Sequence, residues 1–134
     1  MLAVSNQISR ERSEASEWVD VCSLDDIVVG TGVAALVQGH QVAIFRPQPE
    51  QLFALSNFDP FSRAFVMSRG IVGDKQGVLK VASPIYKQNF ELATGQCLDE
   101  PKVRLPSYPV SIERGRVLVS VASAGVAAGL EQSA

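Results

Sequence analysis

Short apolar runs alternate with turn-forming residues along the chain from about residue 18 to residue 121. In residues 87–92, Phe90 and Leu92 fall on one face and polar residues fall on the other, which is the two-residue period of a β-strand. The runs "YPVSIE" and "RVLVSV" flank Arg114-Gly115 and predict a hairpin. Further strands are predicted in "EWVDVCS", "TGVAALVQ", "QVAIFRP", "QLFALSN" and "GVLKVAS".

Short strands separated by Gly and Pro, with no long helical pattern, indicate an all-β antiparallel sandwich or barrel. The stretch "FDPFSRAFVMSRGIVGDKQG", residues 58–77, shows little alternation and is predicted to be mostly loop. We expect residues 17–121 to form one domain. It would lie between a disordered N-terminal tail, residues 1–16, and a low-complexity C-terminal tail, residues 122–134.

Charge and hydropathy narrow the classes of function. The net charge is −2 at pH 7, and Lys and Arg form no stripe interleaved with aromatic residues, so nucleic acid is not an expected partner. No apolar run approaches the roughly 18–20 residues that a membrane span needs, so no membrane association is expected. The first residues, "MLAVSNQISRERSEASE", lack the apolar core of a signal peptide. We therefore expect a cytoplasmic protein with reduced thiols.

The usual soft metal ligands are few. The chain has one histidine, His40, and two cysteines, Cys22 and Cys97, which excludes a Cys2His2 site within one chain. These three residues show none of the short ligand pairs that zinc sites use. No second histidine follows Cys97 to act as a base, so we interpret it as a packed structural cysteine.

Two segments carry a resemblance to a known family. "NFDPF" follows one predicted strand, "SPIY" follows another, and "FELATG" comes after "SPIY". This order resembles a Rieske-type iron–sulfur domain, and it comes with the framework residues Pro60, Gly70, Pro84, Phe90, Thr94, Gly95 and Pro101. The resemblance implies a Rieske-like antiparallel β-sandwich or barrel, with a loop-rich subdomain at the position of the lost cluster site.

The four ligand positions of that family hold other residue types. By the family's pattern, Asp59 and Ser83 stand at the cysteine positions, and Phe61 and Tyr86 stand at the histidine positions. A Rieske cluster needs two thiolates on one iron and two imidazoles on the other. A serine hydroxyl is a poor ligand for a soft metal, and phenylalanine offers no lone pair. The resemblance therefore implies the fold without its iron–sulfur cluster.

A narrower resemblance accounts for these changes. The motifs "VAIFR", "NFDPF", "MSRGIVGD", "SPIYKQNF", "TGQC" and "YPV" occur in this order. The combination is similar to the small subunits of assimilatory NAD(P)H-dependent nitrite reductases. In that family the large subunit holds siroheme, a [4Fe–4S] cluster and FAD, and the small subunit supports the reduction of nitrite to ammonia. The resemblance implies that this chain holds no cofactor, metal or catalytic residue, and that its partner is such a large subunit.

The two loops need another connection once a cluster is lost. We predict that Phe61 and Tyr86 pack on each other, or on the neighbouring prolines and Ile85, and so staple the loops together. Asp59 is predicted to accept backbone N–H bonds within its own loop. If the two aromatic residues are instead exposed, they are candidates for contact with a partner.

Basic residues surround the same loops. Arg63, Arg69, Lys75 and Lys87 are candidates for contact with an acidic patch on a partner. Two other hypotheses remain open. One is a degenerate Rieske-type electron carrier or sensor that acts without a [2Fe–2S] cluster, and the other is a hydrolase or transferase that uses Cys97.

Overall fold

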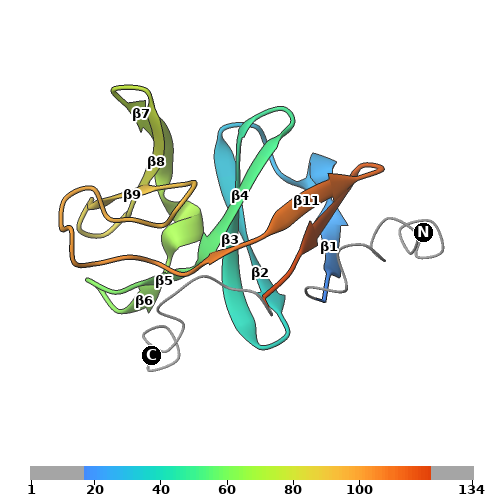
Figure 1. Ribbon diagram of the computed structural model, residues 1–134, viewed down its shortest axis with the longest axis horizontal. Helices are drawn as coiled ribbons and strands as arrows, with labels where there is room; N and C mark the ends of the chain where they lie inside the picture. The colour runs from blue at the N-terminus through green and yellow to red at the C-terminus, as the bar shows by residue number, and fades with distance from the viewer. Residues whose placement is uncertain (1–16, 122–134) are drawn as a thin grey trace.

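The computed structural model describes residues 17–121, in which antiparallel β-strands dominate (Figure 1). The strands are β1 Val19–Ser23, β2 Thr31–Val37, β3 His40–Gln48, β4 Gln51–Ser56, β5 Phe58–Asp59, β6 Ala64–Phe65, β7 Ile71–Lys75, β8 Val78–Ala82, β9 Asn89–Glu91, β10 Ser107–Tyr108, β11 Val110–Glu113 and β12 Arg116–Val119. Two 3₁₀ helices, η1 Leu24–Asp26 and η2 Met67–Arg69, join them. Within residues 17–121, no helix is long and apolar enough to cross a membrane. The two predicted tails lie outside the described residues.

The central sheet has the strand order β10-β4-β3-β2. On one side of it lie the sheet β7-β8-β9 and the small β5-β6 hairpin, and on the other side lie β1 and β11 of the sheet β1-β12-β11 (Figure 1). Each predicted strand has a counterpart, and the hairpin at Arg114-Gly115 joins β11 to β12. The prediction of an all-β antiparallel fold is therefore confirmed.

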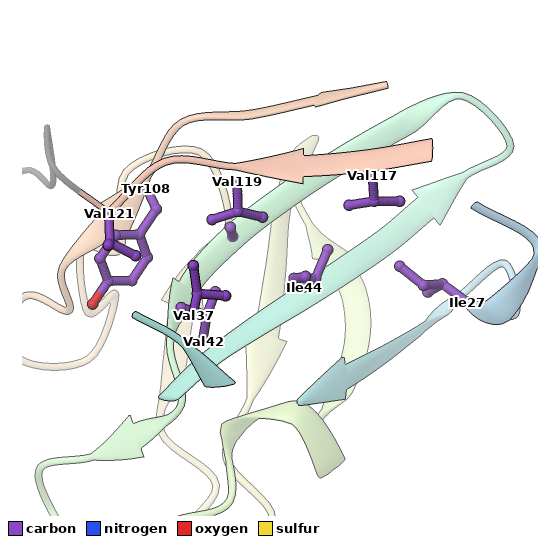
Figure 2. Packing of buried hydrophobic residues seen from close by; sticks show 9 residues of the cluster. Ile27, Val37, Val42, Ile44, Tyr108, Val117, Val119 and Val121 are labelled. Atoms are coloured by element: carbon purple, nitrogen blue, oxygen red, sulfur yellow. The ribbon is translucent and has the colours of Figure 1, made fainter. Parts of the chain in front are cut away.

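Strand β3 separates two apolar cores. Val42 and Ile44 belong to the first core, whereas Ala43 and Phe45 belong to the second, and all four side chains are fully buried. Successive side chains of a strand point to opposite faces, so the run "VAIF" requires cover on both sides. Figure 2 shows the first core, in which β3 faces the valines of β12.

Two framework glycines allow close contacts around the second core. A Cβ atom on Gly70 would collide with the carbonyl oxygen of Ala82. Gly95 has a φ of +82°, and a Cβ there would collide with the carbonyl oxygen of Leu105. Any other residue would have to displace backbone atoms at both places, which explains why glycine stands there.

The prediction that residues 58–77 are mostly loop is wrong for the last part of that stretch. All five residues of β7 pair with β8, from Ile71 opposite Ala82 to Lys75 opposite Val78. Strand β7 is the edge of its sheet, and its residues are exposed or half-buried. No residue of β7 is buried, so its sequence lacks the apolar alternation of a strand with one buried face. The earlier part of the stretch holds only the short β5-β6 hairpin and η2.

Candidate functional site

Two five-residue turns occupy the loops that correspond to the lost ligands. The first turn, "DPFSR" (59–63), joins β5 to β6, and the second turn, "SPIYK" (83–87), lies between β8 and β9. In the first turn the Arg63 N–H donates to the Asp59 carbonyl at 2.6 Å, and in the second the Lys87 N–H donates to the Ser83 carbonyl at 3.1 Å. Arg63 and Lys87 have φ values of +62° and +69°. Each turn is therefore closed by its own backbone hydrogen bond, and the last residue of each has a left-handed backbone conformation.

A buried hydrogen bond joins the two turns at their first residues. The Ser83 hydroxyl donates to Asp59 Oδ2 at 2.5 Å, and both residues are 0% exposed. The same carboxylate accepts the Phe61 N–H and the Ser62 hydroxyl, each at 2.9 Å. Three hydrogen-bond donors thus satisfy this buried carboxylate. The prediction that Asp59 accepts a backbone N–H within its loop is confirmed.

The two aromatic residues of the turns differ in burial. Phe61 is half-buried at the edge of the second core, with its ring centroid 6.1 Å from that of Phe90. Tyr86 is 59% exposed. The prediction that both rings staple the loops together is therefore wrong for Tyr86. The hydrogen bond between Asp59 and Ser83 links the two turns, and Tyr86 lies at the surface.

The four candidate basic residues are all exposed, but they do not form one group. Arg63 and Lys87 end the two turns, and Arg69 ends η2, directly before Gly70 at the start of β7. Lys75 lies at the opposite end of β7, next to the tight turn to β8. A strand of five residues spans about 13 Å between its ends, so Lys75 is separated from the two turns.

The side chains at the four ligand positions do not fit a [2Fe–2S] cluster. Asp59 and Ser83 offer oxygen atoms that already bond each other, whereas the cluster takes thiolates. Phe61 has no donor atom, and Tyr86 is exposed. Within the described part of the chain, no group of three or more His, Cys, Asp or Glu side chains is placed to hold a metal ion. The arrangement suits a hydrogen-bonded link between loops.

The thiols are poor candidates for chemistry. Cys97 is 2% exposed within the second core, and burial is the main cause that raises the pKa of its thiol. Burial also raises the pKa of Cys22, with the Asp26 carboxylate adding to the effect. A raised pKa keeps a thiol protonated at neutral pH, where it is a weak nucleophile. The geometry agrees with Cys97 as a packed residue.

The Asp59–Ser83 bond was not predicted from the sequence. Its two residues are 24 positions apart, and neither is unusual alone. A signal exists nevertheless, because "DPFSR" and "SPIYK" both read as a polar residue, proline, an apolar residue, a variable residue and a cation. This shared pattern indicates two turns of the same kind.

Comparison with known proteins confirms the predicted Rieske-like fold. Residues 17–120 match the family model described as a Rieske-like [2Fe-2S] domain. The NADH nitrite reductase small subunit of Salmonella typhimurium is 48% identical over 103 residues, which cover 76% of this chain and 95% of the relative. The solution structure of the nitrite reductase [NAD(P)H] small subunit from Erwinia carotovora is 49% identical, with a TM-score of 0.69, and the match covers 82% of this chain and 85% of that one.

A match to a longer protein adds information about assembly. A nitrite reductase [NAD(P)H] large subunit of Klebsiella oxytoca is 39% identical over 102 residues. The match covers 76% of this chain but only 11% of the longer one, so a segment similar to this chain is part of that polypeptide. The chain described in this structure belongs to the Rieske-like [2Fe-2S] domain family and to the small subunits of NADH nitrite reductase.

Proposed function

We propose that this chain is the small, cofactor-free subunit of a cytoplasmic NAD(P)H-dependent nitrite reductase. It supports a large subunit that reduces nitrite to ammonia. The siroheme, the [4Fe–4S] cluster and the FAD belong to the large subunit in this proposal. The small subunit contributes a rigid surface for association and no reacting group.

The observation that carries the proposal is the hydrogen bond between Asp59 and Ser83. It joins the two cysteine positions inside a frame that otherwise keeps the Rieske-like arrangement of strands and loops. The loops are thus held together by polar atoms that are unsuited to a redox cluster. A chain with this shape and these donors suits binding better than electron transfer.

The Klebsiella oxytoca relative supports association with a large subunit. In that protein a segment similar to this chain shares one polypeptide with a nitrite reductase large subunit. Two domains that are joined in one chain are held at high effective concentration, which favours contact between them. The same contact between separate chains would give the complex proposed here.

Co-expression with a siroheme-dependent nitrite reductase large subunit tests the proposal. We expect the two chains to co-purify and the complex to reduce nitrite with NADH or NADPH faster than the large subunit alone. If the chains fail to associate, and nitrite reduction is unchanged when this chain is deleted, the proposal is wrong.

Metal analysis of the purified small chain is the matching control. A folded, colourless protein without stoichiometric iron or zinc agrees with a cofactor-free subunit. A bound metal with visible absorption bands would favour the degenerate electron carrier or sensor instead.

A further inference from the structure

The two linked turns together carry two exposed apolar side chains and two exposed cations. Ile85 is 45% exposed and Tyr86 is 59% exposed, and Lys87 follows them in the second turn. Arg63 ends the first turn and is also exposed. We call these four residues, Arg63, Ile85, Tyr86 and Lys87, the turn face.

Hydrogen bonds hold the two halves of the turn face together. The Arg63 N–H is bound to the Asp59 carbonyl, and the Lys87 N–H is bound to the Ser83 carbonyl. The Ser83 hydroxyl in turn donates a hydrogen bond to the Asp59 carboxylate. This continuous path fixes the backbone of both turns to one buried link, so the backbone of the face is preformed and requires little ordering on binding.

The backbone conformation of the two cations is unusual. Five non-glycine residues among residues 17–121 have positive φ. Three of them, Gln38, Gln76 and Arg114, precede a glycine in two-residue hairpin turns, where positive φ at both positions is required. Arg63 and Lys87 instead end the longer turns. Glycine or asparagine would adopt this conformation with less strain, so stability alone does not explain the two cations.

The turn face is positively charged, whereas the chain as a whole is negatively charged. The net charge of the whole chain is −2. Neither Arg63 nor Lys87 forms an ion pair with a described residue, and the Asp59 carboxylate is buried and hydrogen-bonded within the two turns. Among the residues that the structure describes, the Lys87 ammonium donates only to the Pro84 carbonyl of its own turn, at 3.4 Å. The linked turns therefore carry positive charge without a described ion-pair partner, together with an exposed apolar pair.

We propose that the turn face docks on the large subunit of the nitrite reductase, at a surface where acidic side chains border an apolar depression. This inference rests on the function proposed above. An apolar centre with a polar rim is the usual arrangement of protein interfaces, and Tyr and Arg are enriched among the residues that contribute most to binding. Complementary charge at the rim speeds association and makes it depend on salt.

The test measures binding of the full-length chain to purified large subunit, at about 50 mM and about 300 mM NaCl. We expect Ile85→Ser/Tyr86→Ser to weaken binding at least about tenfold. We expect Arg63→Asn/Lys87→Asn to weaken binding at low salt and to remove most of its salt dependence, because asparagine keeps the left-handed backbone but removes the charge. Thermal unfolding of each variant checks that the domain stays folded.

Two variants serve as matched controls on other surfaces. Arg114→Asn removes an exposed cation that also has positive φ, and Leu36→Ser removes an apolar side chain that is 73% exposed on β2. We expect both to bind like the wild-type chain. The inference is overturned if the turn-face variants bind like wild type, or if the control variants lose as much affinity. A wild-type chain that does not bind the large subunit at all would instead refute the proposed function, and with it this inference.

Discussion

The first and second turns have the same backbone plan but treat their apolar side chains differently. Each begins with a buried polar residue and continues with proline. Each ends with a cationic residue whose backbone is in the left-handed conformation. In the first turn the apolar residue, Phe61, packs beside Phe90 at the second core. In the second turn Ile85 and Tyr86 are exposed. The first turn is anchored by its side chain, whereas the second leaves its side chains available.

This difference separates two tasks that a metal cluster would combine. The Asp59–Ser83 bond links the loops, and Phe61 attaches the first loop to the core. Neither task requires Tyr86, so the second turn can expose an aromatic ring without loss of the fold. Three of the four residues at the ligand positions, Asp59, Ser83 and Phe61, therefore make contacts that hold the loops, whereas Tyr86 is exposed.

The largest expected effect comes from removal of the shared carboxylate. Asp59→Ala should lower the free energy of unfolding by about 3 kcal/mol, because three donors lose their acceptor in a buried site. Urea unfolding measures this change. The control is Asp74→Ala, which removes a carboxylate that accepts the Gly77 N–H at 2.9 Å in an exposed turn, and it should cost about 1 kcal/mol or less. Equal losses in the two variants would contradict a central role for the link.

The next effect compares the two aromatic residues directly. Phe61→Ala should lower the free energy of unfolding by about 2 kcal/mol, which is less than for a fully buried phenylalanine because the ring is half-buried. Tyr86→Ala should change it by less than about 0.5 kcal/mol, since the ring is mostly exposed. Thermal or urea unfolding under one set of conditions decides the order. A larger loss for Tyr86→Ala would instead support the prediction that both aromatic rings staple the loops.

Cys97 reports on how tightly the first turn is anchored. Cys97 forms an isolated β-bridge with Phe90, and the ring of Phe90 lies beside the ring of Phe61. Burial keeps its pKa raised, so alkylation by iodoacetamide at pH 8 should be slow in the wild-type chain. Phe61→Ala should speed the modification several-fold by uncovering this part of the core, whereas Tyr86→Ala should not. Mass spectrometry of the modified peptide measures the rate, and equal rates in the two variants would remove the distinction between the turns.

The smallest effect is a dependence of stability on pH. The raised pKa of Cys97 lies above the ordinary thiol value of 9.0. As the pH rises above 9.0, the thiol of the unfolded chain loses its proton while the thiol of the folded chain keeps it. The free energy of unfolding is therefore highest below pH 9.0 and falls as the pH rises from 9.0 to the folded-state pKa. Urea unfolding should show a shallower decline between about pH 8 and about pH 10 in Cys97→Ala. The same slope in both proteins would show that this thiol is not protected.

Local patterns in the sequence predicted most of the fold. Alternation identified the strands around Phe90 and in the final hairpin, because a half-buried strand repeats every two residues. Strand β7 was missed because none of its residues is buried, so its sequence shows no such repeat. The resemblance located the four ligand positions, but alternation does not show which of them meet in space.

The site depends on contacts between distant residues, which local patterns do not record. The bond between Asp59 and Ser83 spans 24 positions. Tyr86 is 59% exposed, so the prediction that it helps to staple the loops is wrong. The repeated pattern of polar residue, proline, apolar residue and cation was the available signal.

A double-mutant cycle on the two linked residues tests the central claim most directly. Asp59→Ala, Ser83→Ala and the double variant are compared with the wild-type chain by urea unfolding at neutral pH. If the two side chains stabilise the fold through their mutual bond, the double variant should lose about 1–2 kcal/mol less than the sum of the single losses. Single losses that add within about 0.3 kcal/mol would contradict the claim that this bond replaces the link of the lost cluster.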